Sequence, residues 1–399
     1  MDLSGLSELL SIESPWLISD IQLQKKNEVI DVYISIERGS KFPCPVCGQK
    51  CAVHDSNYIR IRHLDLFEYR CYLNVKIPRI NCPRDGVKVI NGNNWSRKGS
   101  HYSRKLEVQI IRLCKQMSVS AVSSELGEPD NNLWRVLHDH VSNTVIDSFD
   151  FRSVKRVCVD ETAIKRGHNY ISIFTDYDTG RVLFATEGRK KDVFDLFYGW
   201  LWDMGGLPSN VELFSMDMSK SYKAGRQEYF AHSEVVYDRF HIKKGLNDAI
   251  DKVRRDEVKE VETLKKTRYI WLKNENNLTS YQQEQLRSFL CHSSTKTAQA
   301  YLLKNSFDQL WSIQKEAVEP LMNEWLDLAL DLVLKPFDKF VNTIIDHYQG
   351  VVMSIKTGIT NAISEGLNSV MQLARSRARG FRNTKNFIAM VYFLGAAQN

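Results

Sequence analysis

The sequence lacks any long apolar run. No stretch approaches the roughly 18 uninterrupted apolar residues of a membrane-spanning helix, so no membrane association is expected. The N-terminal residues MDLSG carry no basic region ahead of an apolar segment, so no secretion signal is evident. Internal repeats and low-complexity tracts are also missing. These absences predict a globular, cytoplasmic protein.

Composition sets the scale of the fold. With 399 residues, of which 43% are hydrophobic and 11% aromatic, the chain can form several domains with a substantial core. The net charge of +6 is compatible with nucleic-acid binding without being diagnostic of it. Charge is more informative locally, because residues 375–385 carry five cations and no anion.

Cysteines are concentrated near the N-terminus. Cys44-x-x-Cys47 and Cys82-x-x-Asp85 form two tight knuckles separated by stretches that alternate apolar and polar residues, as β-strands do. In a cytoplasmic protein this pattern indicates metal ligation before disulfides. It predicts a zinc ribbon over residues 1–100, with a structural Zn²⁺ bound by Cys44, Cys47, Cys82 and Asp85.

The fourth zinc ligand is left open by the sequence. Aspartate is a less usual structural zinc ligand than cysteine or histidine. Cys51, His54, His63 and Cys71 lie in the same window and are alternatives to Asp85. A ribbon that has lost its metal is a further alternative.

After residue 100 the apolar residues recur at the spacing of an α-helix. A helix, a short helix ending at Gly127, a turn containing Pro129 and another helix predict a helix-turn-helix over residues 101–150. A plain three-helix connector is the alternative.

An α/β pattern follows. Three strands, a helix, a strand, a helix and a strand are predicted in that order, at 154–160, 169–176, 181–187, 191–204, 211–217, 219–231 and 234–238. This order is typical of a ribonuclease-H-like fold. We expect its first part at 151–245, an all-α insertion at 246–345 and a C-terminal helical part at 346–399.

Three acidic residues occupy settings suited to metal-dependent phosphodiester chemistry. Asp160 and Asp217 each end an apolar strand pattern, and Glu365 lies in a later helical pattern. Such carboxylates can converge on two Mg²⁺ ions, which clamp the attacking and leaving oxygens of the reaction. Taken singly, each is better explained as an ordinary cap at the end of a helix or strand.

Two basic groups accompany the acidic residues. Asp238 is followed by Arg239, His241 and Lys243 at the end of a predicted strand, where open α/β sheets bind ligands. The helical pattern from Glu365 continues into the second group, so we expect Arg379 on the same face as that carboxylate. The residues expected to contact DNA are Arg239, His241, Lys243, Arg375, Arg379 and Arg382. Solvated cations, with Asp238 as a helix cap, are the alternative reading.

The order of these motifs resembles a known family. They are Cys-Pro-x-Cys-Gly, the helix-turn-helix, Val-Asp160-Glu161-Thr, Ser-Met-Asp217-Met-Ser-Lys-Ser-Tyr222, Asp238-Arg-Phe-His241, Ser364-Glu365-Gly-Leu-Asn368 and Ala378-Arg379-Gly-Phe-Arg382-Asn383. Together, over about residues 40–395, they resemble the DDE transposases of ISL3 bacterial insertion sequences. The resemblance implies that Asp160, Asp217 and Glu365 form the catalytic triad. Asp85 departs from the cysteine or histidine usual in relatives.

The resemblance also implies a reaction and partners. A DNA transposase of this kind binds the terminal inverted repeats of its element and catalyses Mg²⁺-dependent cleavage and strand transfer. Holding two element ends and target DNA implies a homodimer or a larger synaptic complex. Two other functions fit the same residues: a structure-specific nuclease that cuts without joining, and a non-enzymatic regulator derived from a transposase.

Overall fold

The computed structural model describes residues 3–90, 95–164, 170–292, 295–360 and 362–396. The chain divides into two compact units, Met1–Val136 and Leu137–Asn399, and the division falls within one helix. Across the described helices, none combines the length and apolar character needed to cross a membrane.

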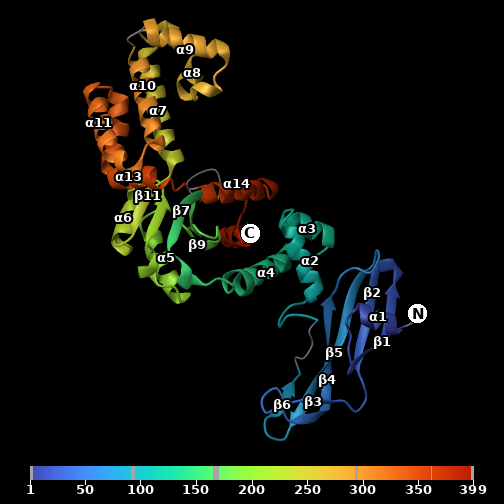
Figure 1. The fold of residues 1–399 in the computed structure, drawn as a ribbon. Coiled ribbons are helices and arrows are strands. Elements are labelled where there is room, and N and C mark those ends of the chain that lie inside the picture. Colours follow the sequence, from blue (N-terminus) through green and yellow to red (C-terminus); the bar gives the residue numbers. More distant parts are fainter. Residues whose placement is uncertain (1–2, 91–94, 165–169, 293–294, 361, 397–399) are drawn as a thin grey trace. The chain divides into compact units, whose positions relative to one another are not determined.

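The first unit is built on a six-stranded sheet (Figure 1). Its strand order is β1-β2-β5-β4-β3, and β6 pairs with β5. Alternate residues of β5, from Cys71 to Ile77, are buried, as expected of a strand with one face on a core. The helix and strands are α1 (Leu3–Leu9), β1 (Trp16–Gln24), β2 (Val29–Ile36), β3 (Lys41–Pro43), β4 (Lys50–Arg62), β5 (Arg70–Cys82) and β6 (Gly86–Val89).

Three helices follow the sheet: α2 (Arg104–Cys114), α3 (Val119–Leu126) and α4 (Asp130–His140). Side-chain oxygens of Ser103 and Ser118 cap the first two by accepting backbone N–H groups. Gly127 ends α3 with a φ of 63°, a conformation that favours glycine. The short link to α4 gives the two-helix turn that the sequence predicts.

A buried ion-pair network joins this turn to the sheet. Arg62, at the end of β4, is 3% exposed and pairs with Glu128 at 3.2 Å and with Asp65 at 2.6 Å. The Tyr102 hydroxyl donates to the other Glu128 oxygen at 2.9 Å. A buried charge is tolerated when it is paired and hydrogen-bonded in this way. The network therefore fixes the turn between α3 and α4 relative to the sheet.

The second unit contains a five-stranded sheet with the order β11-β10-β7-β8-β9 (Figure 1). Strands β7, β8 and β9 are antiparallel neighbours, whereas β10 is parallel to both β7 and β11. The elements are β7 (Arg156–Ala163), β8 (Tyr170–Asp176), β9 (Val182–Glu187), α5 (Asp192–Asp203), β10 (Leu213–Met216), α6 (Lys220–Tyr229) and β11 (Glu234–Tyr237). Their order along the chain is the one predicted from the sequence.

Helices cover both faces of this sheet. Phe194 and Phe197 of α5 pack on Phe174 and Phe214 within the main core. Helices α14 (Ala362–Arg377) and α15 (Thr384–Gly395) contact β7 and β9, respectively. Large aromatic side chains thus hold α5 firmly to one face.

The chain between β11 and α14 is helical throughout its described part. Helix α7 packs against α10 and α12, and buried Trp271, Tyr301 and Phe307 belong to the same apolar cluster as the sheet. The helices are α7 (Arg239–Glu257), α8 (Arg268–Leu272), α9 (Ser280–His292), α10 (Lys296–Gln309), α11 (Val318–Asp331), α12 (Lys335–Asp346) and α13 (Tyr348–Thr357). Burial of these aromatic side chains therefore stabilises the helical segment.

Candidate active site and metal centre

The strand register brings three aspartates into one row. Ser215 of β10 lies opposite Cys158 of β7, and Met216 lies opposite Tyr237 of β11. If the β10–β7 register is continued by two residues, Asp217 lies opposite Asp160. If the β10–β11 register is continued by one residue, Asp217 lies opposite Asp238. The Asp238 N–H donates to the Met216 carbonyl at 3.1 Å, which extends the pairing to that position. Aligned positions on neighbouring strands face the same side of a sheet.

The Asp160 carboxyl has a strongly raised pKa. Its pKa is raised to about 6, mainly by burial; nearby Asp217 and Asp238 contribute to the rise, while the Glu161 N–H and His241 oppose it. Asp160 also lies within β7 rather than at its end, contrary to the sequence prediction. The strand is longer because its pairing with β8 continues to Ala163.

Asp217 and Asp238 are fixed by local backbone hydrogen bonds. The Ser219 N–H donates to Asp217 at 2.8 Å, and the Phe240 N–H donates to Asp238 at 3.1 Å. Asp238 therefore caps α7, as the alternative reading of the sequence held. Its second carboxylate oxygen lies 3.8 Å from His241 Nε2, which places the imidazole beside the row.

Glu365 lies in a different part of the chain from the three aspartates. It lies exposed in the first turn of α14. Three residues later on this helix, the Asn368 amide donates to Asp160 Oδ2 at 2.6 Å. Glu365 therefore stands one helical turn from a side chain that contacts the aspartate row.

The predicted DNA-contacting cations differ in their surroundings. Arg239 lies over the Trp311 ring at 4.5 Å, and Lys243 pairs with Asp308 at 3.0 Å. The Arg375 guanidinium donates to the Ala163 carbonyl at 2.6 Å, whereas Arg379 and Arg382 are exposed.

The prediction that Arg379 continues the Glu365 helix is wrong. Helix α14 ends at Arg377, and Arg379 has a φ of 52°. The Gly380 N–H donates to the Arg375 carbonyl, and the left-handed turn at Arg379–Gly380 closes the helix. The four turns of unbroken helix that would place Arg379 above Glu365 do not exist.

The first unit brings four candidate zinc ligands together. One atom each of Cys44, Cys47, Cys82 and Asp85 lies within 4.8 Å of all the others. The Cys47 and Cys82 sulfurs are 3.5 Å apart, and Asp85 Oδ2 is 3.2 Å from the Cys44 sulfur. A tetrahedral zinc with Zn–S bonds of about 2.3 Å separates two sulfur ligands by roughly 3.8 Å, so the donor set fits that ion.

Other candidate ligands lie in different environments. The Cys51 thiol is buried beside the cluster and donates to the Gln49 carbonyl. His63 is buried against Ser103 at 2.7 Å, and Cys71 belongs to a separate apolar core cluster. His54 lies beside Asp55 at 3.5 Å. Over the described part of the chain, only the Cys44 set is this compact; the Asp160, Asp217 and Glu365 carboxylates are not gathered as tightly.

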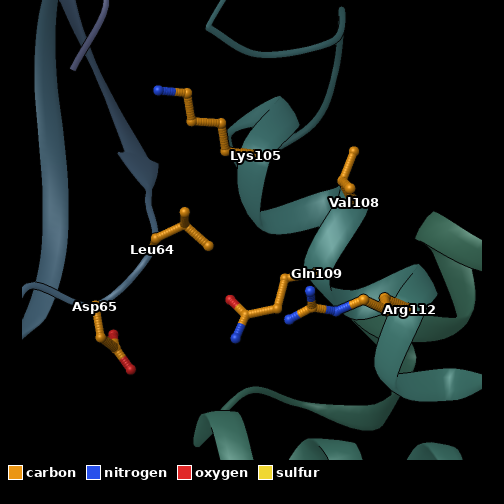
Figure 2. A pocket seen from close by; sticks show the side chains of 6 residues that line it. All are labelled: Leu64, Asp65, Lys105, Val108, Gln109 and Arg112. Carbon is orange, nitrogen blue, oxygen red and sulfur yellow. The ribbon is translucent and has the colours of Figure 1, made fainter. Parts of the chain in front are cut away.

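A surface hollow of about 430 Å³ lies beside α2 (Figure 2). Lys105, Gln109 and Arg112 recur at helical spacing and line it from one face of α2. Leu64 and Asp65 line it from the segment after β4. The first helix of the three-helix group therefore presents two cations and an amide together.

Family models match three parts of the chain. The profile of an ISL3 transposase domain, described as "Transposase", matches residues 157–391, more than half of the chain. The chain belongs to the ISL3 family of transposases. Residues 93–141 of this transposase match the family's helix-turn-helix domain, and residues 40–94 match a zinc-finger of transposases IS204, IS1001, IS1096 and IS1165.

Two curated relatives extend over most of the ISL3 transposase. The transposase for insertion sequence element IS1001 of Bordetella parapertussis is 24% identical over 363 residues, covering 87% of each chain. The transposase for insertion sequence element IS1557 of Mycobacterium tuberculosis is 23% identical over 381 residues, covering 87% of this chain and 84% of the relative. The chain is thus a DNA-binding transposase with a zinc ribbon, a helix-turn-helix and an α/β catalytic region.

Sequence reasoning missed part of the site of this transposase. Asp238 was recognised as a carboxylate near a strand end, but not as the third member of the row. Asn368 was noted only as part of a family motif. In the predicted strands Asp160 and Asp217 each lie six residues after the strand start and Asp238 lies four residues after its own, so the predicted ranges did not reveal the row. No sequence signal predicts the contact between Asn368 and Asp160.

Removing one knuckle cysteine should release the zinc. Without metal, a hydrogen bond to Asp85 raises the Cys47 pKa to about 12, so zinc binding must displace a thiol proton. Metal analysis should find about one zinc per chain in the wild type and little in Cys44→Ser. Cys71→Ser, in the separate core, is the matched control and should keep its zinc. Full zinc content in Cys44→Ser would contradict the assignment.

Divalent-cation binding at the aspartate row should weaken as pH falls. Because the Asp160 pKa is raised to about 6, its carboxylate is ionised at neutral pH and protonated in mild acid, where protons compete with the cation. Affinity for Mn²⁺ at this site, measured by electron paramagnetic resonance, should fall about tenfold between pH 7 and pH 5. Pre-loading the ribbon with zinc isolates this site, and pH-independent affinity would contradict the prediction.

Proposed function

We propose that this transposase cuts and joins DNA in a ribonuclease-H-like domain through Asp160, Asp217 and Glu365. The strand order β11-β10-β7-β8-β9, with β7–β9 antiparallel and β10 and β11 parallel to β7, supports that fold. Helices α7–α12 then form an all-α insertion between β11 and the Glu365 helix. The proposed domains are 1–100, 101–150, 151–245, 246–345 and 346–399.

The aspartate row carries the catalytic proposal. Carboxylate oxygens are the ligands that Mg²⁺ prefers, and Asp160 and Asp217 supply them from aligned positions next to each other across β7 and β10. Burial is the main cause of the raised Asp160 pKa, repulsion from Asp217 and Asp238 adds to it, and a bound cation would relieve that repulsion. Two Mg²⁺ ions, when bound, would stabilise the attacking and leaving oxygens of phosphodiester displacement.

The protein's own groups orient these carboxylates. The Ser219 N–H fixes the rotamer of Asp217, and the Asn368 amide holds one oxygen of Asp160. Glu365 completes the acidic set from α14. His241, beside Asp238, offers a donor to a DNA phosphate at the start of α7, where the helix dipole favours anions. The remaining basic residues proposed to contact DNA are Arg239, Lys243, Arg379 and Arg382, whereas the guanidinium of Arg375 is engaged by the Ala163 carbonyl.

The first unit is proposed to recognise the terminal inverted repeats. A structural zinc held by Cys44, Cys47, Cys82 and Asp85 would stabilise the ribbon, and the helix-turn-helix would place α4 in the major groove. The cations of α2 offer phosphate contacts, which position DNA without reading its sequence. Two element ends must be held together, so the working assembly is proposed to be a homodimer or larger.

The rival functions are less well supported. A nuclease that only cuts has no need of both a zinc ribbon and a helix-turn-helix, and this chain matches both transposase modules. A non-enzymatic regulator has no need of an aspartate row in register across three strands. The row is the single observation that most favours catalysis.

Neutralising one acidic residue should abolish catalysis and spare DNA binding. For Asp160→Asn, Asp217→Asn and Glu365→Gln we expect cleavage and strand transfer of element-end DNA to fall by on the order of 10³-fold or more, since several kcal/mol of transition-state stabilisation is lost. The triple variant should be little worse, because the residues act as a unit.

The matched control is Asp178→Asn, an exposed aspartate in the β8–β9 turn that pairs with Arg156. It should keep near-normal activity. A triad variant that cleaves at the wild-type rate with Mg²⁺ would refute the assignment of that residue. Cleavage without joined product in the wild type would instead favour the nuclease.

A further inference from the structure

Helix α14 meets strand β7 at three successive points. The Ser364 hydroxyl lies beside the Cys158 thiol; burial raises the pKa of that thiol to about 12, and the hydroxyl opposes the rise. Asn368 donates to Asp160 at 2.6 Å, and Arg375 donates to the Ala163 carbonyl at 2.6 Å. The order of contacts is the same along both elements, so the helix runs parallel to the strand.

The spacing of the contacts matches the geometry of both elements. From Cys158 to Ala163 the strand advances five residues, or about 16.5 Å at about 3.3 Å per residue. From Ser364 to Arg375 the helix advances eleven residues, also about 16.5 Å at about 1.5 Å per residue. Helix and strand therefore stay in step over the whole contact.

The three helix residues also share one face. At about 100° per residue, Ser364, Asn368 and Arg375 fall within roughly 40° of one another around the helix axis. Glu365 lies about 100° from Ser364, beside this stripe rather than on it. The stripe binds the strand and leaves the Glu365 side chain exposed, three residues before Asn368.

We propose that Asn368 and Arg375 are positioning residues that hold α14 in register with β7 and so set the place of Glu365 relative to Asp160. This inference rests on the proposed role of Glu365 as the third catalytic carboxylate. It gives Arg375 a function different from that of Arg379 and Arg382. A guanidinium that donates to a main-chain carbonyl of β7 at 2.6 Å serves as a clamp, whereas the two arginines beyond the helix end are exposed.

If Arg375 holds α14 on β7, its removal should slow cleavage without weakening DNA binding. Arg375→Ala should lower the cleavage rate of bound DNA by on the order of 10²-fold, because a misplacement of about 1 Å has that effect. It should leave the salt dependence of DNA binding unchanged. Arg382→Ala, the matched control, should reduce the slope of log K against log salt by about 0.9, the effect of one lost phosphate contact. Arg375→Lys keeps a donor at this position and should recover part of the rate.

Hydrogen exchange on the metal-free protein tests the clamp without catalysis. Arg375→Ala and Asn368→Ala should each speed amide exchange in α14 and leave the β10 and α5 amides protected, which shows that the sheet remains folded. Glu365→Gln should abolish cleavage with no change in α14 exchange. If Glu365→Gln cleaves normally, the proposed triad fails while the exchange result still reports on the clamp.

Two results would overturn the inference. One is a salt slope that falls by about 0.9 in Arg375→Ala with an unchanged cleavage rate, which would make Arg375 a phosphate contact. The other is unaltered α14 exchange in both Arg375→Ala and Asn368→Ala, which would show that the two hydrogen bonds do not hold the helix.

Discussion

The parallel register of β7, β10 and β11 is the constraint on which the site depends. A shift of one residue between β7 and β10 would turn Asp217 to the opposite face of the sheet from Asp160. The register is held by the apolar core beneath it, where Val157, Phe214 and Met216 are fully buried against α5 and α6. Burial of one face therefore fixes the carboxylates on the other.

Glu365, the acidic residue of α14, lies far along the chain from Asp160 and Asp217. Between Asp238 and Glu365 the chain forms helices α7–α13, which share the sheet's apolar cluster through residues such as Trp271 and Phe307. Beyond this segment the chain returns to the sheet, where Asn368 and Arg375 of α14 donate hydrogen bonds to Asp160 and Ala163 of β7. In the first unit, too, a polar side-chain interaction links a helical segment to a sheet: the Arg62–Glu128 ion pair fixes the turn between α3 and α4 to β4.

Local sequence patterns predicted the secondary structure and the candidate zinc ligands better than they predicted the contacts between distant residues. The alternation of buried residues located the strands, and the paired knuckles located the four residues that the first unit gathers. Asp160 and Asp217 were selected for their positions at predicted strand ends, yet Asp160 lies inside β7, because strand length depends on a hairpin partner that periodicity does not reveal. The end of α14 was misjudged because the Arg-rich pattern continues while Arg379 adopts a left-handed conformation. Contacts such as Asn368 with Asp160 join residues 208 positions apart and have no local signature.

Iron-directed cleavage of the protein backbone tests most directly whether these distant residues share one metal site. Fe²⁺ accepts the same carboxylate ligands as other divalent metals, and with peroxide it generates radicals that cut nearby backbone. The zinc-loaded wild type should be cut near residues 160, 217 and 365, and Asp160→Asn should lose all three cuts together. Cuts near residues 160 and 217 without any near 365, or cuts that persist in Asp160→Asn, would contradict the convergence of α14 and the aspartate row on one site.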